Sequence, residues 1–124
     1  MPLLWVMIAG GLGSGARYLV GQWATARLGP SFPYGTLIVN LAGCFALGVI
    51  AQLGASTSWS PELRAAVAIG FLGGFTTYST FNQETLTLLA AGSTAPALLN
   101  IMVTLIGGFA SGWLGIVAAR QLMA

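Results

Sequence analysis

The sequence predicts an all-α integral membrane protein in which four helices cross the bilayer and the third is broken near its middle. Of the 124 residues, 56% are hydrophobic and only 5% are charged, whereas charged residues make up about a quarter of an average soluble domain. Four apolar segments are each long enough to cross a hydrocarbon core about 30 Å thick, which takes about 20 helical residues. The connections between them leave no room for a water-soluble domain. Residues 1–124 are therefore expected to form a single transmembrane domain.

The first two spans are predicted over residues 3–27 and 33–54. Trp5 and Trp23 lie near the two ends of the first span, about 27 Å apart along a helix, which suits a pair of aromatic anchors at the membrane interfaces. No basic segment typical of a signal peptide precedes the first span, so we expect this helix to be retained. Glycine and proline residues within 29–33 prevent the first helix from continuing into the second.

The third and fourth spans are predicted over residues 61–91 and 95–121. Ser60 is a favourable N-cap, Pro61 fits the first helical position, and Glu62 favours the positive end of the helix dipole. The short turn GSTAP separates the two spans. Its glycine and proline indicate that the helix direction reverses there.

The few charged side chains exclude several function classes. The chain has no His, Lys or Asp, and these side chains supply many zinc sites and general bases. Cys44 is the only cysteine, so it cannot form a disulfide within the chain, and we interpret it as a small packing residue. A net charge of +2 from so few groups does not indicate a nucleic-acid partner. The charged residues are Arg17, Arg27, Arg64, Arg120, Glu62 and Glu84.

Residues 73–81, GGFTTYSTF, place poor helix formers near the middle of the third span. Two glycines and two threonines fall together there, which suggests two half-helices that meet at a break. Within hydrocarbon, unwound backbone persists only where it is buried in protein or lines a hydrated cavity. The free carbonyls of such a break suit a small cation, and its free amides suit an anion. The alternative is a kink whose hydroxyls bond to the preceding turn, and the composition alone leaves both open.

Polar residues also align on the neighbouring spans. Thr36 and Asn40 are one turn apart on the second span, and Tyr78 and Phe81 share a face of the third. Such alignment indicates either a polar track for a permeating species or interhelical hydrogen bonds worth about 0.6 kcal/mol each. The fourth span carries a single polar and small-residue stripe at Asn100, Thr104, Gly107 and Ser111.

The charge distribution gives only a small orientation signal. With four spans, both termini and the connection between the second and third spans lie on one side, together with Arg64 and Arg120. The other side holds Arg27, and two arginines against one is a small bias under the positive-inside rule. The charges therefore leave open whether the chain inserts in both orientations and whether two opposed copies form a dimer. Pairs of glycines four residues apart are compatible with packing within the subunit or with a dimer contact.

Three motifs carry a resemblance to a known family. They are GFLGGFTTYSTFNQET at residues 70–85, GARY at 15–18 and GTLIVNLAGCFALG at 35–48. The first resembles the third-helix signature of the Fluc (CrcB) fluoride channels, and the other two look like that family's first two helices. The resemblance implies an antiparallel, dual-topology homodimer of four-helix subunits in the lipid bilayer of a cell inner membrane. It also implies two fluoride pores and one central, structural Na⁺.

The resemblance assigns roles to particular residues. It implies that the backbone carbonyls of Gly73 and Thr76 hold the Na⁺, as oxygen ligands hold other hard cations. Arg17 matches the arginine of the family's first helix, near a vestibule where it would raise the local anion concentration. Glu84 matches the acidic residue after the signature and is expected to play a supporting part. The implied fluoride pore residues are Asn40, Tyr78, Ser79, Thr80, Phe81, Asn100 and Thr104.

Tyr78 stands where the family has the first of two pore phenylalanines, whose ring edges carry partial positive charge and can face an anion. Asn100 and Thr104 also replace the Tyr and Ser that the family often has on its fourth helix. The implied pore therefore differs from the family pattern in its aromatic pair and on its fourth helix.

The function implied by the resemblance is passive export of fluoride, which keeps its cytoplasmic concentration low. The sequence contains no nucleotide-binding motif and no catalytic nucleophile, so it does not indicate a pump or an enzyme. A proton-coupled small multidrug exporter is one alternative, but such an exporter needs a carboxylate in its first helix, and residues 3–27 contain none. A non-transporting membrane scaffold is the other alternative. A scaffold has no need of an unwound segment beside aligned polar residues.

Overall fold

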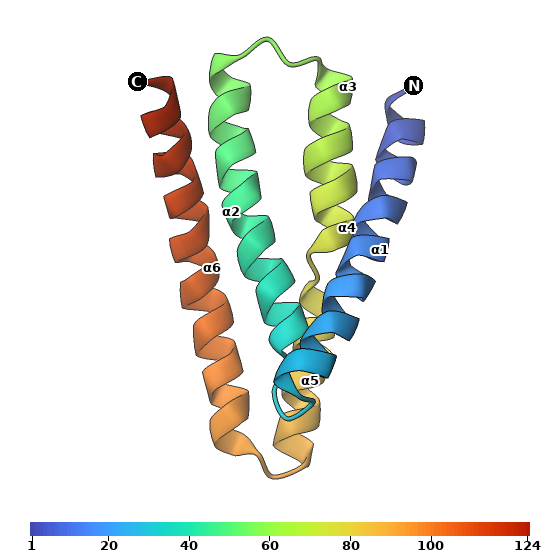
Figure 1. Ribbon diagram of the computed structural model, residues 1–124, viewed down its shortest axis with the longest axis vertical. Helices are drawn as coiled ribbons and strands as arrows, with labels where there is room; N and C mark the ends of the chain where they lie inside the picture. The colour runs from blue at the N-terminus through green and yellow to red at the C-terminus, as the bar shows by residue number, and fades with distance from the viewer.

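The computed structural model describes residues 1–124, and the chain is helical throughout apart from its connections and one interruption. Three long helices are continuous: α1 (Pro2–Leu28), α2 (Tyr34–Ser56) and α6 (Thr94–Met123). Figure 1 shows both termini at the same end of the bundle as the connection between α2 and α3. The segment between α2 and α6 is divided into α3 (Pro61–Arg64), the π-helix η1 (Ala65–Leu72), α4 (Gly73–Phe75) and α5 (Tyr78–Ala90).

The helix ends follow from the local sequence. Gly29 ends α1 with a positive φ of 85°, and its N–H donates to Thr25 O at 3.1 Å. Ser60 caps α3, where its side-chain oxygen accepts from Leu63 N at 3.1 Å. Gly92 adopts a φ of 79° in the turn before α6. Left-handed backbone of this kind favours glycine because a Cβ would be strained. The observed ends lie within about two residues of those that the sequence predicts.

The chain has the surface of a multi-pass membrane protein. The helices α1, α2 and α6 are each long and apolar enough to cross a membrane, whereas the pieces of the third segment are too short to qualify alone. Large apolar side chains are exposed along all the long helices. Only a thin core is buried within the subunit, which leaves the outer surface to hydrocarbon. The buried core consists of Ala24, Val39, Leu72, Phe81, Ala97 and Ala119.

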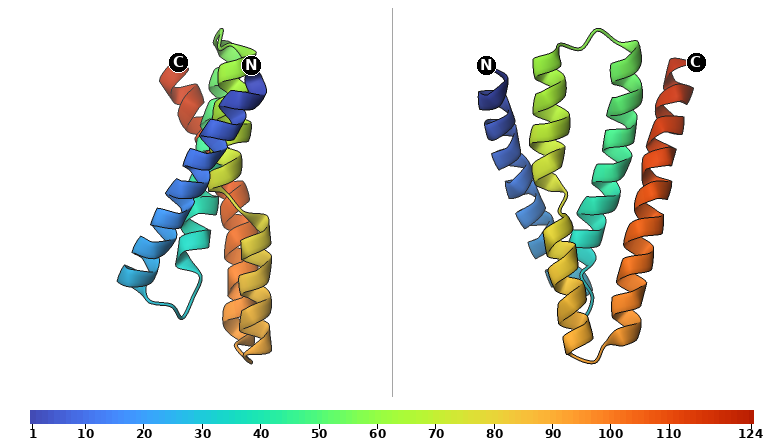
Figure 2. Two further views of the ribbon diagram at one scale, coloured as in Figure 1. Left: turned by 90° about the vertical axis from the view of Figure 1, so that its right-hand side faces the viewer. Right: turned by 180° about the vertical axis from the view of Figure 1, so that it is seen from behind.

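The helices form two arms that diverge toward the end with the termini. One arm pairs α2 with α6, and the other pairs α1 with η1 and α4, as both face-on views show (Figures 1 and 2). The side view shows the connection between α1 and α2 well apart from the connection between α5 and α6 (Figure 2). The break between α4 and α5 lies near the middle of the bundle, where the arms converge (Figure 1).

Glycines bring the backbones within each arm into contact. A Cβ at Gly74 would collide with the carbonyl oxygen of Gly10, and one at Gly48 would collide with that of Gly112. These glycines therefore serve packing within the subunit. Gly11 and Gly15, which share the same four-residue spacing, have no atom within 4 Å of an added Cβ.

Candidate functional site

The third membrane segment is interrupted at Thr76 and Thr77, inside the stretch where the sequence predicts a break. α4 ends at Phe75, α5 begins at Tyr78, and the two residues between them are extended. Their φ and ψ values are −84° and 159° for Thr76 and −153° and 125° for Thr77. The helical hydrogen-bond ladder therefore stops on one side of this pair and starts again on the other.

Asn40 of α2 satisfies both backbone groups of Thr77. Its Nδ2 donates to Thr77 O at 3.0 Å, and Thr77 N donates to its Oδ1 at 2.8 Å. An unwound residue at membrane depth needs partners for its backbone groups from the protein or from a hydrated cavity, because each unpaired group is costly. The single amide of Asn40 replaces the two helical bonds that Thr77 lacks. Asn40 uses the donor and the acceptor of its side-chain amide on the same unwound residue. The position of Asn40 on its helix does not predict this pairing.

The break also leaves backbone carbonyls without their helical partners. Gly74 O accepts from Arg17 Nε at 3.0 Å and from Ser14 Oγ at 3.5 Å. The carbonyl oxygens of Gly73 and Thr76 accept no hydrogen bond from any group in the subunit. Free carbonyl dipoles of this kind are the ligands that enclosed cations use in channels.

Thr77 also caps the start of α5. Its side-chain oxygen accepts from Thr80 N at 3.2 Å and donates to Thr80 Oγ1 at 3.0 Å. A threonine at this position satisfies one of the free amides of the first turn. The cap fixes where α5 begins and therefore which side chains of its first turn face each neighbouring helix.

An open cavity of about 300 Å³ lies beside the break. Tyr78 and Phe81 both line it and meet edge to face, with ring centroids 5.7 Å apart. Phe81 is 6% exposed and Tyr78 is 76% exposed, so one ring is fixed within the subunit and the other projects from it. The wall consists of Asn40, Gly43, Cys44, Leu47, Ala68, Leu72, Gly73, Thr76, Thr77, Tyr78, Phe81, Thr104 and Leu105.

Gly43 lets α2 approach the break closely. A Cβ at this position would collide with the Thr76 methyl group. We expect Gly43→Ala to lower the temperature at which the protein unfolds, even though alanine raises helix propensity by about 1 kcal/mol over glycine. Gly11→Ala is the matched control, since nothing lies within 4 Å of its added Cβ. Thermal unfolding of both variants in detergent tests this expectation, and equal stability would contradict it.

A second, more polar cavity of about 510 Å³ lies on the α1 side of the break. Arg17 lines it and also bonds to Gly74 O, so the guanidinium joins this cavity to the break. Thr80 lines this cavity and not the one that holds Phe81. Ser79 is exposed and lines neither. The wall consists of Ser14, Arg17, Tyr18, Gly21, Gln22, Thr25, Gly35, Thr36 and Thr80.

Of the polar α1 residues in this cavity, Arg17 belonged to the predicted site, whereas Ser14, Gln22 and Thr25 did not. Ser14, Arg17, Gln22 and Thr25 fall at helical spacing on one side of α1. Their spacing is visible in the sequence. This shared face was overlooked because glycines and apolar residues separate the polar residues along the chain.

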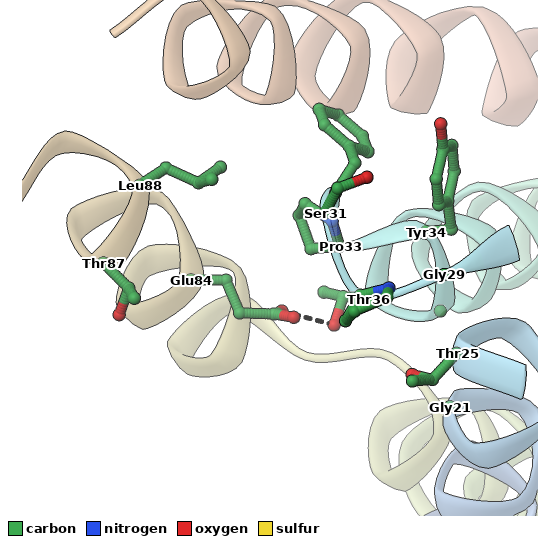
Figure 3. A pocket seen from close by; sticks show the side chains of 13 residues that line it. Gly21, Thr25, Gly29, Ser31, Pro33, Tyr34, Thr36, Glu84, Thr87 and Leu88 are labelled. Atoms are coloured by element: carbon green, nitrogen blue, oxygen red, sulfur yellow. Dashed lines mark hydrogen bonds between the residues drawn. The ribbon is translucent and has the colours of Figure 1, made fainter. Parts of the chain in front are cut away.

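Glu84 lies in a third cavity of about 290 Å³, where α5 meets the connection between α1 and α2 (Figure 3). Thr36 Oγ1 donates to Glu84 Oε1, the contact drawn as a dashed line in Figure 3. A carboxylate near the membrane interior needs such a partner. Thr25, Thr36 and neighbouring glycines line both this cavity and that of Arg17, so the two polar cavities adjoin.

Asn100 is buried between α5 and α6 and does not line the cavity of Phe81. It is 2% exposed, and its Nδ2 donates to Thr85 Oγ1 at 2.9 Å. Thr104, which does line that cavity, donates from Oγ1 to Asn100 Oδ1 at 3.4 Å. Thr85 was absent from the predicted site, although its position one turn after Phe81 is visible in the sequence.

Comparison with known proteins identifies relatives along almost the entire chain. The family model described as "CrcB-like protein, Camphor Resistance (CrcB)" matches residues 4–116. A protein of Sorangium cellulosum (strain So ce56), named "Fluoride-specific ion channel FluC", is 46% identical over 121 residues, which are 97% of this chain and 95% of the relative. Proteins with the same name are 43% identical in Geobacter metallireducens, over 98% of this chain and 99% of the relative, and 42% identical in Acidobacterium capsulatum, over the full length of both. The chain belongs to the CrcB-like protein family.

Proposed function

We propose that this protein is a fluoride-selective channel that lets fluoride leave the cell passively and so lowers its cytoplasmic concentration. The observation that carries the proposal is the break at Thr76 and Thr77, clamped by Asn40 and placed beside an aromatic pair. The names of the full-length relatives support it. A channel needs no chemical step, and the chain is accordingly not an enzyme.

The proposed path brings fluoride through the polar cavity on the α1 side. Arg17 lines that cavity, and its positive charge raises the concentration of anions there. Thr80 offers a hydroxyl donor where the cavity reaches the break. Ser79, which lines neither cavity, presents its hydroxyl on the exposed side of the same turn of α5. Glu84 stays bonded to Thr36 and supports the wall of the path without offering its charge to the anion. Hydroxyl donors of this kind can replace water around a small, strongly hydrated anion.

Beyond the break, the path follows the cavity of Tyr78 and Phe81. Ring edges carry partial positive charge, so they stabilise a passing anion without binding it as tightly as a full charge would. Asn40 and Thr104 supply polar groups along the same wall. Asn100 acts from behind this wall, through its bonds to Thr85 and Thr104.

A structural Na⁺ fits the carbonyl groups at the break. The Gly73 and Thr76 oxygens would hold it, since both lack any other partner in the subunit. When bound, the ion supplies a fixed positive charge near the anion path. Sodium is a hard cation that takes oxygen ligands, as calcium and magnesium do.

Two copies in opposite orientations complete the channel in this proposal. Gly73 and Tyr78 are exposed beside the break, as expected of groups that meet a second copy. Arg64 ends α3 and Arg120 lies in the last turn of α6, both at the end with the termini, whereas Arg27 lies in the last turn of α1 at the other end. This small bias permits insertion both ways. The lipid bilayer of the inner membrane is the proposed location, in keeping with the bacterial sources of the relatives.

The proposal is tested by fluoride efflux from liposomes that contain the purified protein. An ion electrode outside the liposomes should record rapid release of fluoride, while chloride loaded in the same way is retained. Liposomes without protein set the background rate. Fluoride release no faster than this background would refute the proposed function.

A further inference from the structure

We propose that Thr85 and Asn100 are positioning residues that fix the ring of Phe81 at the wall of the fluoride path. The inference rests on the proposed function, because the position of the Phe81 ring matters only if fluoride passes along the wall that this ring forms. It concerns two residues that lie behind the cavity and do not touch the permeating ion.

Two hydrogen bonds in series connect Phe81 to α6. Thr85 Oγ1 donates to Phe81 O at 2.8 Å, and Asn100 Nδ2 donates to Thr85 Oγ1 at 2.9 Å. Thr85 and Asn100 are 6% and 2% exposed. If one bond is lost, water cannot reach these polar groups to replace it. Loss of either hydrogen bond is therefore costly.

The chain continues from Asn100 back to the cavity. Thr104 Oγ1 donates to Asn100 Oδ1, and Thr104 lines the same cavity as Phe81. The ring of Phe81 and the hydroxyl of Thr104 are thus two parts of one wall, joined from behind by Asn100. A displacement of either is transmitted to the other through the hydrogen bonds of Asn100 and Thr85.

The position of α5 makes such a tether necessary. α5 begins directly after the unwound pair, so no continuous helical ladder transmits the rotation of α4 to it. Asn40 fixes Thr77 at one end of the first turn. The bond between Thr85 and Asn100 is the single side-chain hydrogen bond that joins α5 to α6. Two fixed points on either side of Phe81 prevent α5 from turning about its axis, and so hold the ring toward the cavity.

Thr85→Val tests the inference, because valine keeps the shape of threonine and removes the hydroxyl. We expect fluoride efflux to fall about tenfold, because the buried amide of Asn100 loses its partner. Thr85→Ser keeps the hydroxyl and should restore most of the rate. The matched control is Thr57→Val, whose hydroxyl also donates to the carbonyl four residues earlier, at 2.7 Å, but is exposed and accepts no second bond. The control should change efflux by less than about twofold.

A double variant separates positioning of the ring from a general loss of structure. If Thr85 acts through Phe81, then Thr85→Val added to Phe81→Ile should slow efflux no further than Phe81→Ile alone. Size-exclusion chromatography shows whether each variant retains the assembly of the unaltered protein. Additive losses, or a Thr85→Val rate equal to that of Thr57→Val, would overturn the inference. If the unaltered protein conducts fluoride in that case, the proposed function stands while the inference fails.

Discussion

Replacing Asn40 with leucine is expected to destabilise the protein and abolish most fluoride efflux. Leucine has a similar volume, but it leaves Thr77 N and Thr77 O without the two partners that Asn40 supplies. Each unpaired group costs about 1–3 kcal/mol, and leucine offers neither a donor nor an acceptor in place of the amide. Thermal unfolding in detergent and efflux from liposomes measure the two effects.

Asn82→Leu is the control for this prediction. Asn82 lies on α5, is exposed and makes no side-chain hydrogen bond, so the same substitution there should change neither measurement appreciably. If Asn40→Leu unfolds at the same temperature as Asn82→Leu and conducts fluoride at the same rate, then the clamp on Thr77 has no functional importance.

Replacing Phe81 with isoleucine is expected to slow efflux by about tenfold while leaving the protein assembled. Isoleucine keeps the apolar volume near the wall of the cavity but has no ring edge to face an anion. An aromatic contact is worth about 0.5–1.5 kcal/mol, and about 1.4 kcal/mol corresponds to a tenfold change. Efflux measured beside size-exclusion chromatography separates lost conduction from lost assembly.

Phe45→Ile provides the comparison for Phe81. Phe45 is an exposed ring on α2 that lines neither of the two cavities beside the break nor the cavity of Glu84. Its replacement should leave efflux close to that of the unaltered protein. Equal rates for the two variants would remove the Phe81 ring from the fluoride path.

The helix boundaries were predictable because local chemistry sets them. Glycine at 29 and 92 adopts left-handed backbone, and Ser60 caps a helix that starts with proline. These requirements concern neighbouring residues only, so they can be read without a structure. The place of the break was predictable for the same reason, since glycine and threonine residues that favour it lie together in residues 73–77.

The arrangement around the break was not predictable, because helical periodicity stops there. A heptad or helical wheel relates residues within one continuous helix, but α4 and α5 are joined by extended backbone. The family resemblance implies that Thr80 and Phe81 belong to one pore, whereas the structure directs them to different cavities. Which side each faces depends on the contacts of Thr77 with Asn40 and Thr80.

The roles of Arg17 and Asn100 likewise depend on contacts between distant segments. Arg17 was expected near a vestibule and does line a polar cavity, but its bond to Gly74 O requires the close packing of α1 against α4. Asn100 was expected to line the pore, and its side chain is instead used within a buried network. No spacing in a single helix distinguishes an amide that faces a cavity from one that faces a neighbouring helix.

An experimental structure of the purified protein in a lipid bilayer, prepared in sodium, would show directly whether the third segment is broken around a bound ion. We expect a third segment unwound at Thr76 and Thr77 and two copies in opposite orientations. We also expect ion density among the Gly73 and Thr76 carbonyl oxygens of both copies. A continuous third helix, or two copies that face the same way, would contradict this expectation.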